Sequence, residues 1–343
     1  MQNSRSGMAV ELAQAPDAVR AQPQLLREPL SDLITWCRRN SPDLVVTCAR
    51  GSSAHAATFG KHLIERHLGI PVAAAAPNIA TVYRQRMRLQ GQLLLTISQS
   101  GRSDDLTEFA LMAKAAGART AAIVNDTESP LAAACEIVLP MGAGPETSVA
   151  ATKSFVASLA VLLRLTAEWL DSDPLQAAIG RLPDRLAAAT RLDWTSALDA
   201  LSQADSLVTI GRGPTLAIAR EAALKLKETC NIHAEAFSGA EFQHGPVALV
   251  SPSYPIVLFM PADEAALGLR QLTLDLQRKG AVVFATDYEA RTEGRLPALP
   301  PDHPDADAVG LIQSFYATAV RIAERRGTDV DRPRHLQKVT RTR

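Results

Sequence analysis

A helix expected from Thr215 to Cys230 carries charged residues on one face. Glu221, Lys225 and Glu228 are spaced at i, i+4 and i+7, so their side chains project from the same side. A solvated salt-bridge stripe is the common explanation for such spacing, but here the flanking residues are rich in Ala and Leu and the helix follows a Gly-Arg-Gly turn. If the stripe faces a cleft, Glu228 can move a proton between adjacent carbons while Lys225 offsets the charge of the developing enolate.

A second group of chemically capable residues is the loop 98–103, with the sequence SQSGRS. It leaves a strongly apolar strand and opens a helix, so its hydroxyl and N–H groups lie where parallel sheets bind ligands and where a helix N-terminus favours anions. Gly101 lets the backbone approach a ligand closely. Ser52 and Ser53 add hydroxyls after an earlier strand. An ordinary helix cap would explain one such loop, but two favour a phosphate monoester site, although the P-loop pattern is missing.

His244 stands before Gly245-Pro246, so we expect it in a turn rather than on an apolar helix face. A neutral histidine can open a sugar ring by passing protons between the ring oxygen and the anomeric hydroxyl. Near the C-terminus, residues 329–340 combine a proline with a run of charges. A disordered basic tail is the alternative there, but a lysine amine whose pKa is lowered can also condense with a sugar carbonyl.

The elements that must position these groups are short apolar runs alternating with amphipathic stretches. This alternation predicts parallel sheets with helices on both faces, which is an α/β fold. The expected strands are residues 44–48, 72–75, 93–97, 120–124 and 137–139, then 207–210, 256–259 and 282–285. A lead-in helix with a loose start is expected over the first ~25 residues, and a long helix over residues 149–169.

The pattern occurs twice along the chain. Residues 45–51 (VVTCARG) align with residues 207–213 (LVTIGRG) at an offset of 162. Two similar domains that arose by duplication explain this better than one large domain. The expected divisions are a lead-in (1–25), a first domain (26–170), linker helices (171–200), a second domain (201–328) and a tail over the active site (329–343). Residues 258–263 (LFMPAD) replace the serine-rich loop in the second half, so only the first half should hold an anion through that loop.

Composition excludes several other classes of protein. Lys and Arg number 36 and Asp and Glu also 36, so no large net field draws the chain to nucleic acid or to an anionic membrane. Aromatic residues are few, which argues against base-stacking surfaces. The cysteines Cys37, Cys48, Cys135 and Cys230 lie far apart, without metal-ligand spacing, and are expected to be small hydrophobes in a reducing compartment. The N-terminus has no apolar signal core, so a cytoplasmic location is expected.

Taken together, these residues resemble the isomerase part of glucosamine-6-phosphate synthase, which is built from two sugar isomerase (SIS) domains. The resemblance runs from about Met8 to the C-terminus. The matching stretches are residues 98–101 (SQSG), 146–153 (ETSVAATK), 223–228 (ALKLKE), 232–236 (IHAEA), 244–246 (HGP) and 331–334 (DRPR). It implies two tandem SIS domains, each a Rossmann-like, doubly wound parallel sheet.

The resemblance also implies roles for individual residues. Glu228 would shuttle the proton between the first two sugar carbons with Lys225 as its helper. His244 would open the ring and reach the site from a neighbouring subunit, which implies a homodimer at least, and Lys338 could form a Schiff base with the ketose. The implied substrate-binding residues are Gly51, Ser52, Ser53, the phosphate-loop residues Ser98, Gln99, Ser100 and Ser103, Val149 through its backbone, and Ala151.

Two departures from the family pattern matter. The synthase begins with a glutaminase domain whose nucleophile is a cysteine near its start, whereas here position 2 is Gln and the first cysteine is Cys37. We therefore expect that this chain does not make ammonia from glutamine. In addition, Ala151 replaces a serine beside the sugar and Arg102 replaces an acidic residue of the phosphate loop. Both changes lie near the expected substrate and suggest a changed reaction balance or a changed substrate.

The expected reaction is therefore hydrolytic: glucosamine 6-phosphate and water give fructose 6-phosphate and ammonia. No metal or organic cofactor is expected, because the imine itself stabilises the carbanion. The alternatives are a deglycase that releases an amino acid from a fructosamine 6-phosphate, a galactosamine-6-phosphate deaminase, and a synthase half supplied by a separate glutaminase. A non-catalytic sugar-phosphate sensor is the alternative of another class, but the short lead-in before Ser31 leaves little room for a DNA-binding domain.

Overall fold

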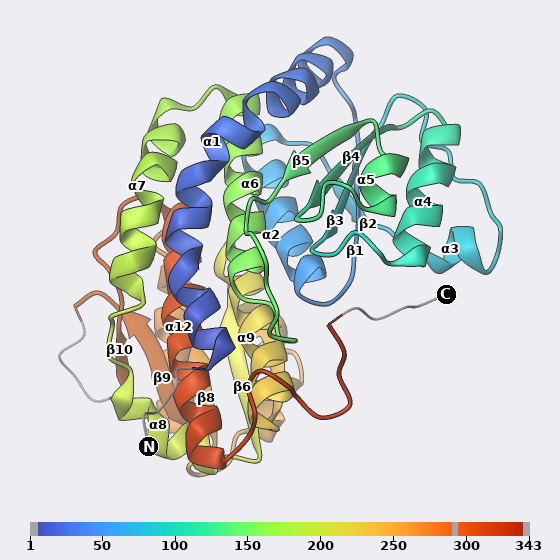
Figure 1. Ribbon diagram of the computed structural model, residues 1–343. Helices are drawn as coiled ribbons and strands as arrows, with labels where there is room; N and C mark the ends of the chain where they lie inside the picture. Colours follow the sequence, from blue (N-terminus) through green and yellow to red (C-terminus); the bar gives the residue numbers. More distant parts are fainter. Residues whose placement is uncertain (1–5, 290–293, 339–343) are drawn as a thin grey trace. The chain divides into compact units, whose positions relative to one another are not determined.

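The computed structural model describes residues 6–289 and 294–338, and these form two compact units (Figure 1). Of the described residues, the leading unit comprises 17–146, 153–180 and 337–338. The trailing unit comprises described residues 6–16, 147–152, 181–289 and 294–336. Helices α1 (Gly7–Asn40) and α7 (Asp173–Ala189) each contribute residues to both units.

The leading unit is built on a five-stranded parallel sheet in the order β2-β1-β3-β4-β5. Its strands are β1 (Val45–Ala49), β2 (Val72–Ala74), β3 (Leu93–Ser98), β4 (Arg119–Val124) and β5 (Ile137–Pro140). Its helices are α2 (Gly51–Leu68), α3 (Asn78–Thr81), α4 (Asp104–Ala115), α5 (Pro130–Ala134) and α6 (Lys153–Leu170). All six residues of β3 are buried, as expected for a continuous apolar strand covered on both faces.

The trailing unit has a second five-stranded parallel sheet, in the order β10-β9-β8-β6-β7. Its strands are β6 (Ser206–Gly211), β7 (His233–Ser238), β8 (Pro255–Leu258), β9 (Val282–Asp287) and β10 (Arg295–Pro297). Its helices are α8 (Thr195–Gln203), α9 (Thr215–Cys230), α10 (Gly239–Gln243), α11 (Ala266–Arg278), α12 (Pro304–Arg326) and the 3₁₀ turn Pro246–Leu249. Numbered within its own unit, this sheet has the same 2-1-3-4-5 order as the first.

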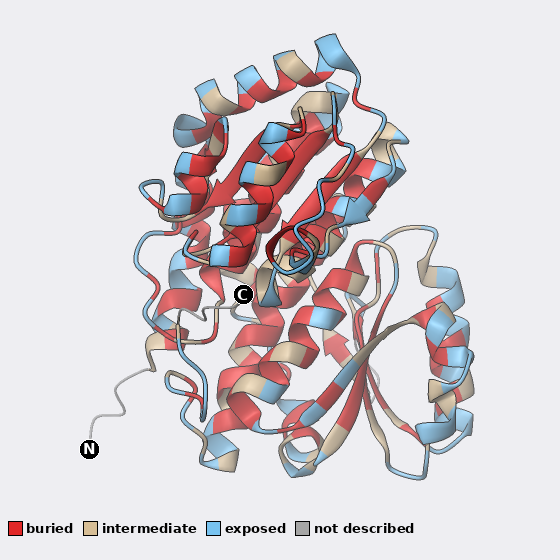
Figure 2. Cartoon of the chain, turned by 90° about the vertical axis from the view of Figure 1, so that its right-hand side faces the viewer, coloured by how far each residue is buried: buried red, intermediate tan, exposed pale blue. Residues whose placement is uncertain are grey.

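The two sheets confirm the expected α/β class and the repeat found in the sequence. In both sheets the second strand lies on one side of the first strand, and the third, fourth and fifth strands lie on the other side. A topological switch point therefore lies between the first and third strands. For the leading unit this point lies between β1 and β3, and for the trailing unit between β6 and β8. The central strands and the inward faces of the helices are buried (Figure 2).

Strands β7 and β10 were not expected from the sequence. Both lie at the edges of the second sheet. In β7 the residues His233 and Glu235 are exposed while Ala234 is buried, so the strand lacks the apolar run that marks a central strand. Strand β10 has only 3 residues. Edge strands are short and partly polar in many sheets. The sequence prediction relied on continuous apolar runs and therefore missed β7 and β10.

Helix α1 is longer than the expected lead-in and continues without a break through three prolines to Asn40. Interior prolines remove backbone hydrogen bonds and lower the helical signal in a sequence. Burial of one face outweighs this penalty: Leu12, Val19, Leu26 and Leu33 are all buried. Gln22 is also buried and donates hydrogen bonds from its amide to the carbonyl oxygens of Met141 and Ala157, both at 2.9 Å.

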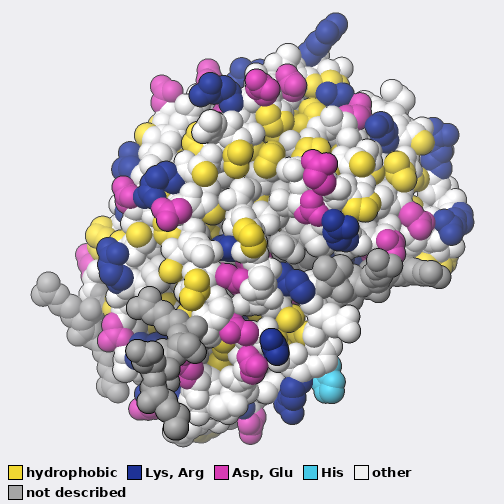
Figure 3. Space-filling model, viewed as in Figure 1, with side chains coloured by type: hydrophobic (Ala, Val, Ile, Leu, Met, Phe, Trp, Pro, Cys, Tyr) yellow, Lys and Arg dark blue, Asp and Glu magenta, His cyan; other side chains and the backbone are white. Residues whose placement is uncertain are grey.

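Basic and acidic side chains are interspersed on the face shown in Figure 3, in keeping with the balanced composition. Among the described residues, no helix has the length and hydropathy needed to cross a bilayer.

Candidate active site

The serine-rich loop and the turn after β1 lie at the same edge of the leading sheet. Strands β1 and β3 are parallel neighbours, with Ala49 paired to Ile97 at their carboxyl ends. The polypeptide therefore leaves both strands side by side, at the switch point of the sheet. This register brings Ser52 and Ser53, in the first turn of α2, to the same edge as the loop that starts at Ser98.

Hydrogen bonds from backbone N–H groups to serine hydroxyls fix the conformation of the loop. The Gly101 N–H donates to Ser98 Oγ at 3.1 Å, and the Arg102 N–H donates to Ser100 Oγ at 3.3 Å. Gly101 has φ +62°, and a Cβ added there would lie 2.0 Å from Ser129 Oγ, so the turn requires glycine. Each serine oxygen accepts one bond here, which leaves the hydroxyl proton able to point toward an anion.

Two guanidinium groups flank this edge of the sheet. Arg50, directly after β1, donates from Nε and Nη2 to Asp105 Oδ2 at 3.0 and 2.8 Å. Arg102, in the loop itself, donates to Asp126 Oδ2 at 2.7 Å. Both arginine side chains are about half exposed, so their remaining N–H groups face solvent at the loop. Sequence reasoning did not assign a site role to Arg50, although its position one residue beyond a strand end was a usable signal.

Lys338 is also in the leading unit, where it is paired with a buried carboxylate. Its Nζ lies 3.0 Å from Glu146 Oε2. Glu146 also accepts from the N–H and the hydroxyl of Ser154, at 3.1 and 2.6 Å. An ammonium held by a carboxylate is a cation rather than a nucleophile. A Schiff base at Lys338 therefore requires this ion pair to open and the amine to lose a proton.

The charged stripe predicted on α9 is buried in the trailing unit rather than solvated. Lys225 is 1% exposed and Glu221 0%, whereas the Glu228 side chain is 20% exposed. Lys225 Nζ lies 3.5 Å from Glu221 Oε1 and makes a closer ion pair with Glu228 Oε2. Helix α12 packs beside α9 (Figure 1) and supplies Tyr316, whose hydroxyl donates to Glu221 Oε1 at 3.1 Å.

Glu228 lines a cavity of about 390 Å³ that also carries positive charge. Arg326, Arg332 and Arg334 line the same cavity, as do polar residues of the α9 and α12 ends, among them Asn231 and Thr328. The Thr328 hydroxyl donates to the carbonyl oxygen of Thr229 at 2.6 Å, which ties the end of α12 to the end of α9. A carboxylate that reaches a cavity beside a buried lysine can exchange protons with a bound molecule, and the guanidinium groups favour an anionic one.

Val149 and Ala151 belong to the segment 147–152 of the trailing unit. The Val149 N–H donates to the carbonyl oxygen of Asp331 at 3.2 Å, so this N–H is used within the protein. The Asp331 carboxylate accepts from the N–H groups of Gly7 and Met8, both at 2.7 Å, and from the Ser148 hydroxyl at 3.1 Å. Asp331 therefore anchors the tail segment to the first turn of α1.

His244 directly follows α10 and is exposed, and its N–H donates to the carbonyl oxygen of Glu241 at 3.0 Å. The predicted turn before Gly245-Pro246 is present, and Gly245 has φ +147°. Within the described chain the predicted residues thus form two groups. The serines, Gln99 and Lys338 belong to the leading unit, and Glu228, Lys225, His244, Val149 and Ala151 belong to the trailing unit.

Two tandem, doubly wound α/β units with the same strand order define the class of this protein. The chain belongs to the SIS domain family, whose model matches residues 41–167 and 200–319. This confirms the resemblance read from the sequence.

The chain is also similar in sequence to individual members of the family. It is 33% identical over 318 residues to the glutamine–fructose-6-phosphate aminotransferase (isomerizing) of Caulobacter vibrioides, a match that covers 86% of this chain and 52% of the relative. The chain thus spans about half the length of the curated relatives it matches.

Solved structures match nearly the whole chain. The C-terminal domain of the glucosamine-fructose-6-phosphate aminotransferase from Francisella tularensis is 25% identical, with a TM-score of 0.83 over 96% of this chain and 99% of its own. A protein from Silicibacter pomeroyi, provisionally described as a phosphosugar isomerase, is 40% identical, with a TM-score of 0.90 over 95% of this chain and 100% of its own.

Proposed function

We propose that this protein is a sugar-phosphate isomerase and, more specifically, that it converts glucosamine 6-phosphate and water to fructose 6-phosphate and ammonia. The observation that carries the proposal is the Glu221–Lys225–Glu228 array on α9. A lysine buried between two carboxylates, one of which reaches a cavity, suits proton transfer next to a developing negative charge. The names of the relatives, which include a phosphosugar isomerase and an amino-sugar-forming aminotransferase, support the same class.

The phosphate group is assigned to the serine-rich edge of the leading sheet. Ser98, Ser100 and Ser53 offer hydroxyl protons there, and Arg50 and Arg102 add positive charge. Charge-assisted hydrogen bonds from guanidinium and hydroxyl groups are the usual means of holding a phosphate monoester. The family's acidic residue at position 102 is an arginine here, which increases the positive charge at this edge.

Proton transfer is assigned to Glu228, with Lys225 fixing its position. In the proposed path His244 assists ring opening to the free aldehyde. Glu228 then removes the proton from C2 of the amino aldehyde, which gives an enolamine, and returns a proton to C1. The product is a ketimine with a hydroxymethyl group at C1. Water adds to the imine carbon, and the C–N bond breaks to release ammonia and leave the ketone of fructose 6-phosphate.

The decisive experiment incubates the purified protein with glucosamine 6-phosphate and measures ammonia and fructose 6-phosphate in parallel. Equal molar amounts of the two products support the proposed reaction. The same assay with galactosamine 6-phosphate and with a fructosamine 6-phosphate tests the alternative substrates. If none of the three releases ammonia or an amino acid, the deaminating function is wrong. If glucose 6-phosphate and fructose 6-phosphate are interconverted instead, only the broader isomerase class stands.

A matched pair of variants tests the assigned base. Glu228→Gln should lower the turnover number by about 10²–10⁴-fold, the range for loss of a general base, while sugar-phosphate binding is retained. Glu324→Gln changes an exposed glutamate of α12 in the same way and should leave turnover unchanged. Full activity in Glu228→Gln would remove Glu228 from the mechanism.

The proposal includes a homodimer in which His244 acts on the site of the other subunit. Coexpression of Glu228→Gln with His244→Asn chains tests this arrangement. In a mixed dimer, the chain with intact Glu228 receives intact His244 from its partner, so one of the two sites is complete. Activity recovered on mixing two inactive variants supports the shared site. No recovery in mixed dimers that are shown to form would place both residues on one chain.

A further inference from the structure

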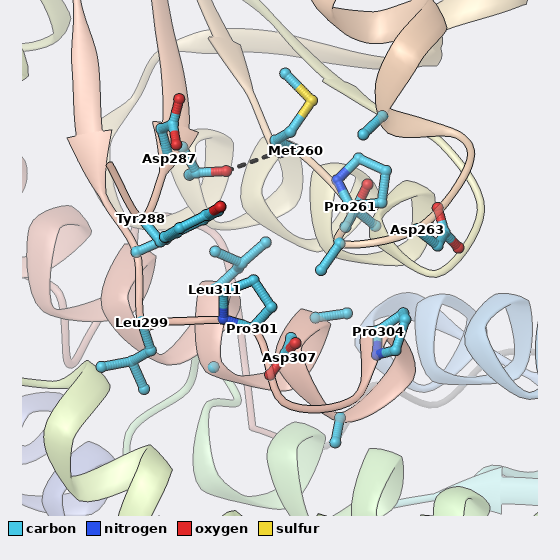
Figure 4. A pocket seen from close by; sticks show the side chains of 18 of the residues that line it. Met260, Pro261, Asp263, Asp287, Tyr288, Leu299, Pro301, Pro304, Asp307 and Leu311 are labelled. Atoms are coloured by element: carbon cyan, nitrogen blue, oxygen red, sulfur yellow. Dashed lines mark hydrogen bonds between the residues drawn. The ribbon is translucent and has the colours of Figure 1, made fainter. Parts of the chain in front are cut away.

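A cavity of about 280 Å³ lies at the carboxyl ends of strands in the trailing unit, apart from the Glu228 array (Figure 4). Met260 and Pro261 follow β8, and Asp287 ends β9 with Tyr288 directly after it. The opposite wall comes from Ala298, Leu299 and Pro301 and from the first turns of α12. The cavity therefore lies beside the switch point between β6 and β8, at the edge that corresponds to the serine-rich edge of the leading sheet.

The chemistry of this cavity is unlike that of the serine-rich loop. Pro261 has no N–H to offer an anion. The start of α11 is already capped by the protein, because Asp263 Oδ1 accepts the Ala265 N–H at 3.0 Å and the Asp263 carbonyl oxygen accepts the Ala266 N–H at 3.0 Å. An incoming phosphate at this helix end would meet the Asp263 carboxylate. The site is therefore unsuited to a sugar phosphate.

The charged groups around the cavity are mainly acceptors of hydrogen bonds. Carboxylates of Asp263, Asp287 and Asp307 line it, against the guanidinium groups of Arg185 and Arg270. Arg185 is held within the protein, donating to Asp307 Oδ1 and to the Pro300 carbonyl oxygen, both at 2.7 Å. Burial raises the pKa of Asp307, whose second carboxylate oxygen accepts the Asp302 N–H at 2.9 Å. Asp287 Oδ1 accepts the Glu289 N–H at 3.0 Å and Asp287 Oδ2 lies 3.5 Å from Arg295 Nη1. Each carboxylate oxygen has more than one lone pair, so Asp287 can still accept from a hydroxyl or amino group of a ligand.

The remaining lining is apolar and includes one aromatic ring. In Figure 4 the Tyr288 side chain projects from the end of β9 into the cavity, with Leu311 and Pro301 on one side and Met260 and Pro261 on the other. Such a slot suits a flat ring that stacks on tyrosine and packs against aliphatic groups. Its volume is close to the lower limit of about 300 Å³ for small-molecule sites, so it suits a small ligand.

The strand ends beside the cavity belong to one βαβ unit. Strand β8, helix α11 and strand β9 form a βαβ unit of adjacent parallel strands. In dinucleotide-binding units of this kind an acidic residue about 20 residues beyond the glycine-rich turn holds the ribose hydroxyls. Asp287 occupies the corresponding strand end, 24 residues after Asp263 (287 − 263). The turn itself has no glycine between Phe259 and Leu267, so it is not shaped to receive a pyrophosphate.

We propose that this cavity binds an uncharged nucleoside, with its base against Tyr288 and Leu311 and its ribose hydroxyls donating to Asp287. The site is separate from the one assigned to isomerisation, because the residues that line it do not overlap with the serine-rich edge or with the α9 array. Binding there is expected whether or not the proposed isomerase activity is found.

Isothermal titration calorimetry on the full chain tests the proposal, with adenosine, guanosine, cytidine and uridine as probes and with AMP and UMP for comparison. At least one nucleoside should bind at one molecule per chain, and its 5′-monophosphate should bind at least 10-fold more weakly. The site is wrong if no nucleoside gives saturable binding up to about 1 mM, a free energy near −4 kcal/mol. Equal or tighter binding of the monophosphates would overturn the assigned chemistry.

Variants then locate the site. Ala262 is exposed and lines the cavity, so Ala262→Trp should block it without disturbing the core and should lower nucleoside affinity at least 10-fold. Leu267→Trp is the control, because Leu267 is 79% exposed on α11 and does not line the cavity. Unchanged affinity in Ala262→Trp would place the nucleoside elsewhere and overturn the proposal.

The ribose contact has its own test. Asp287→Asn should weaken nucleoside binding at least 10-fold, and 2′,3′-dideoxynucleosides should bind the unaltered protein correspondingly weakly. Asp275→Asn on α11, whose carboxylate pairs with Arg278 at the surface, is the matched control. If the dideoxynucleoside binds as tightly as the parent nucleoside, Asp287 does not hold the ribose.

Discussion

The ammonium of Lys225 and the carboxylate of Glu228 form an ion pair within one turn of α9, and only the carboxylate partner reaches solvent. Glu221 lies on the other side of Lys225, fully buried and bonded to Tyr316. The lysine thus neutralises a buried carboxylate and at the same time orients an accessible one. Lys225 therefore contributes both to stability and to the proposed chemistry. For this reason the free energy of unfolding and the turnover number must be measured separately for each variant of the Glu221–Lys225–Glu228 array.

Lys225→Met should be strongly destabilising. Removal of one partner of a buried ion pair leaves the other charge uncompensated, which costs about 3–5 kcal/mol. The surface pair Lys61–Glu65 has the same i,i+4 spacing as Lys225 and Glu221, with both side chains over a third exposed, so Lys61→Met should cost less than about 1 kcal/mol. Urea unfolding measures both free energies. Equal losses would contradict the burial of the α9 array.

Tyr316→Phe should destabilise the protein more than the loss of an ordinary hydroxyl group does, because the Tyr316 hydroxyl bonds a buried carboxylate. Tyr316 is fully buried and its hydroxyl donates to a charged carboxylate, a bond worth about 1.5–3 kcal/mol. Tyr254→Phe removes a hydroxyl that bonds the neutral Ser206 at 3.3 Å, which is worth about 0.5–1.5 kcal/mol. Unfolding free energies should therefore fall further for Tyr316→Phe. Turnover should also fall in this variant alone, since Tyr316 helps to fix Glu221 and through it Lys225.

Gly101→Ala should impair phosphate binding, and Gly91→Ala provides its control. Both glycines have positive φ, so alanine at either costs about 1–2 kcal/mol in backbone strain. A Cβ at Gly101 would also meet the Ser129 side chain, at 2.5 Å from its Cβ, whereas nothing lies within 4 Å of a Cβ at Gly91. The two variants should thus lose similar backbone energy while Gly101→Ala alone distorts the serine loop. A KM for the sugar phosphate at least 10-fold higher in Gly101→Ala, with that of Gly91→Ala unchanged, would confirm the loop's role.

The cysteines should be unreactive in the folded protein and should make stability fall at alkaline pH. All four are buried, and burial raises the pKa of Cys37 and Cys48 to about 12 and that of Cys230 to about 11. Unfolded thiols ionise near pH 8.5. Because the folded pKa values are raised, the stability that the thiols contribute is fully present below about pH 8.5 and is lost as the pH rises toward about 11–12.

Thiol titration with Ellman's reagent checks this at pH 8. The native protein should react at no site, and protein unfolded in urea should react at four. Urea unfolding at pH 7 and pH 9.5 should show the lower stability at the higher pH. Rapid labelling of a native thiol would show that its neighbourhood opens far more readily than the packing indicates.

The sequence by itself determined the fold class, the repeat and the types of residue at the candidate site. Continuous apolar runs such as that of β3 are buried only in a sheet that is covered on both faces. The sequence alone therefore predicted these strands. The spacing of Glu221, Lys225 and Glu228 placed them on one helix face for the same local reason. Hydroxyl-rich turns after β1 and β3 were likewise visible as strand ends.

Only the tertiary structure decided which of these groups are buried and what they contact. The α9 stripe reads equally well as a solvated surface until α12 supplies Tyr316 beside Glu221. Lys338 lies 192 residues from its partner Glu146, and Arg50 lies 55 residues from Asp105. The edge strand β7 forms because β6 offers it a hydrogen-bonding partner, not because its own residues are strongly apolar. Local propensity acts over a few residues, whereas burial and ion pairing depend on parts of the chain that meet only after folding, and for that reason the sequence pattern could not reveal them.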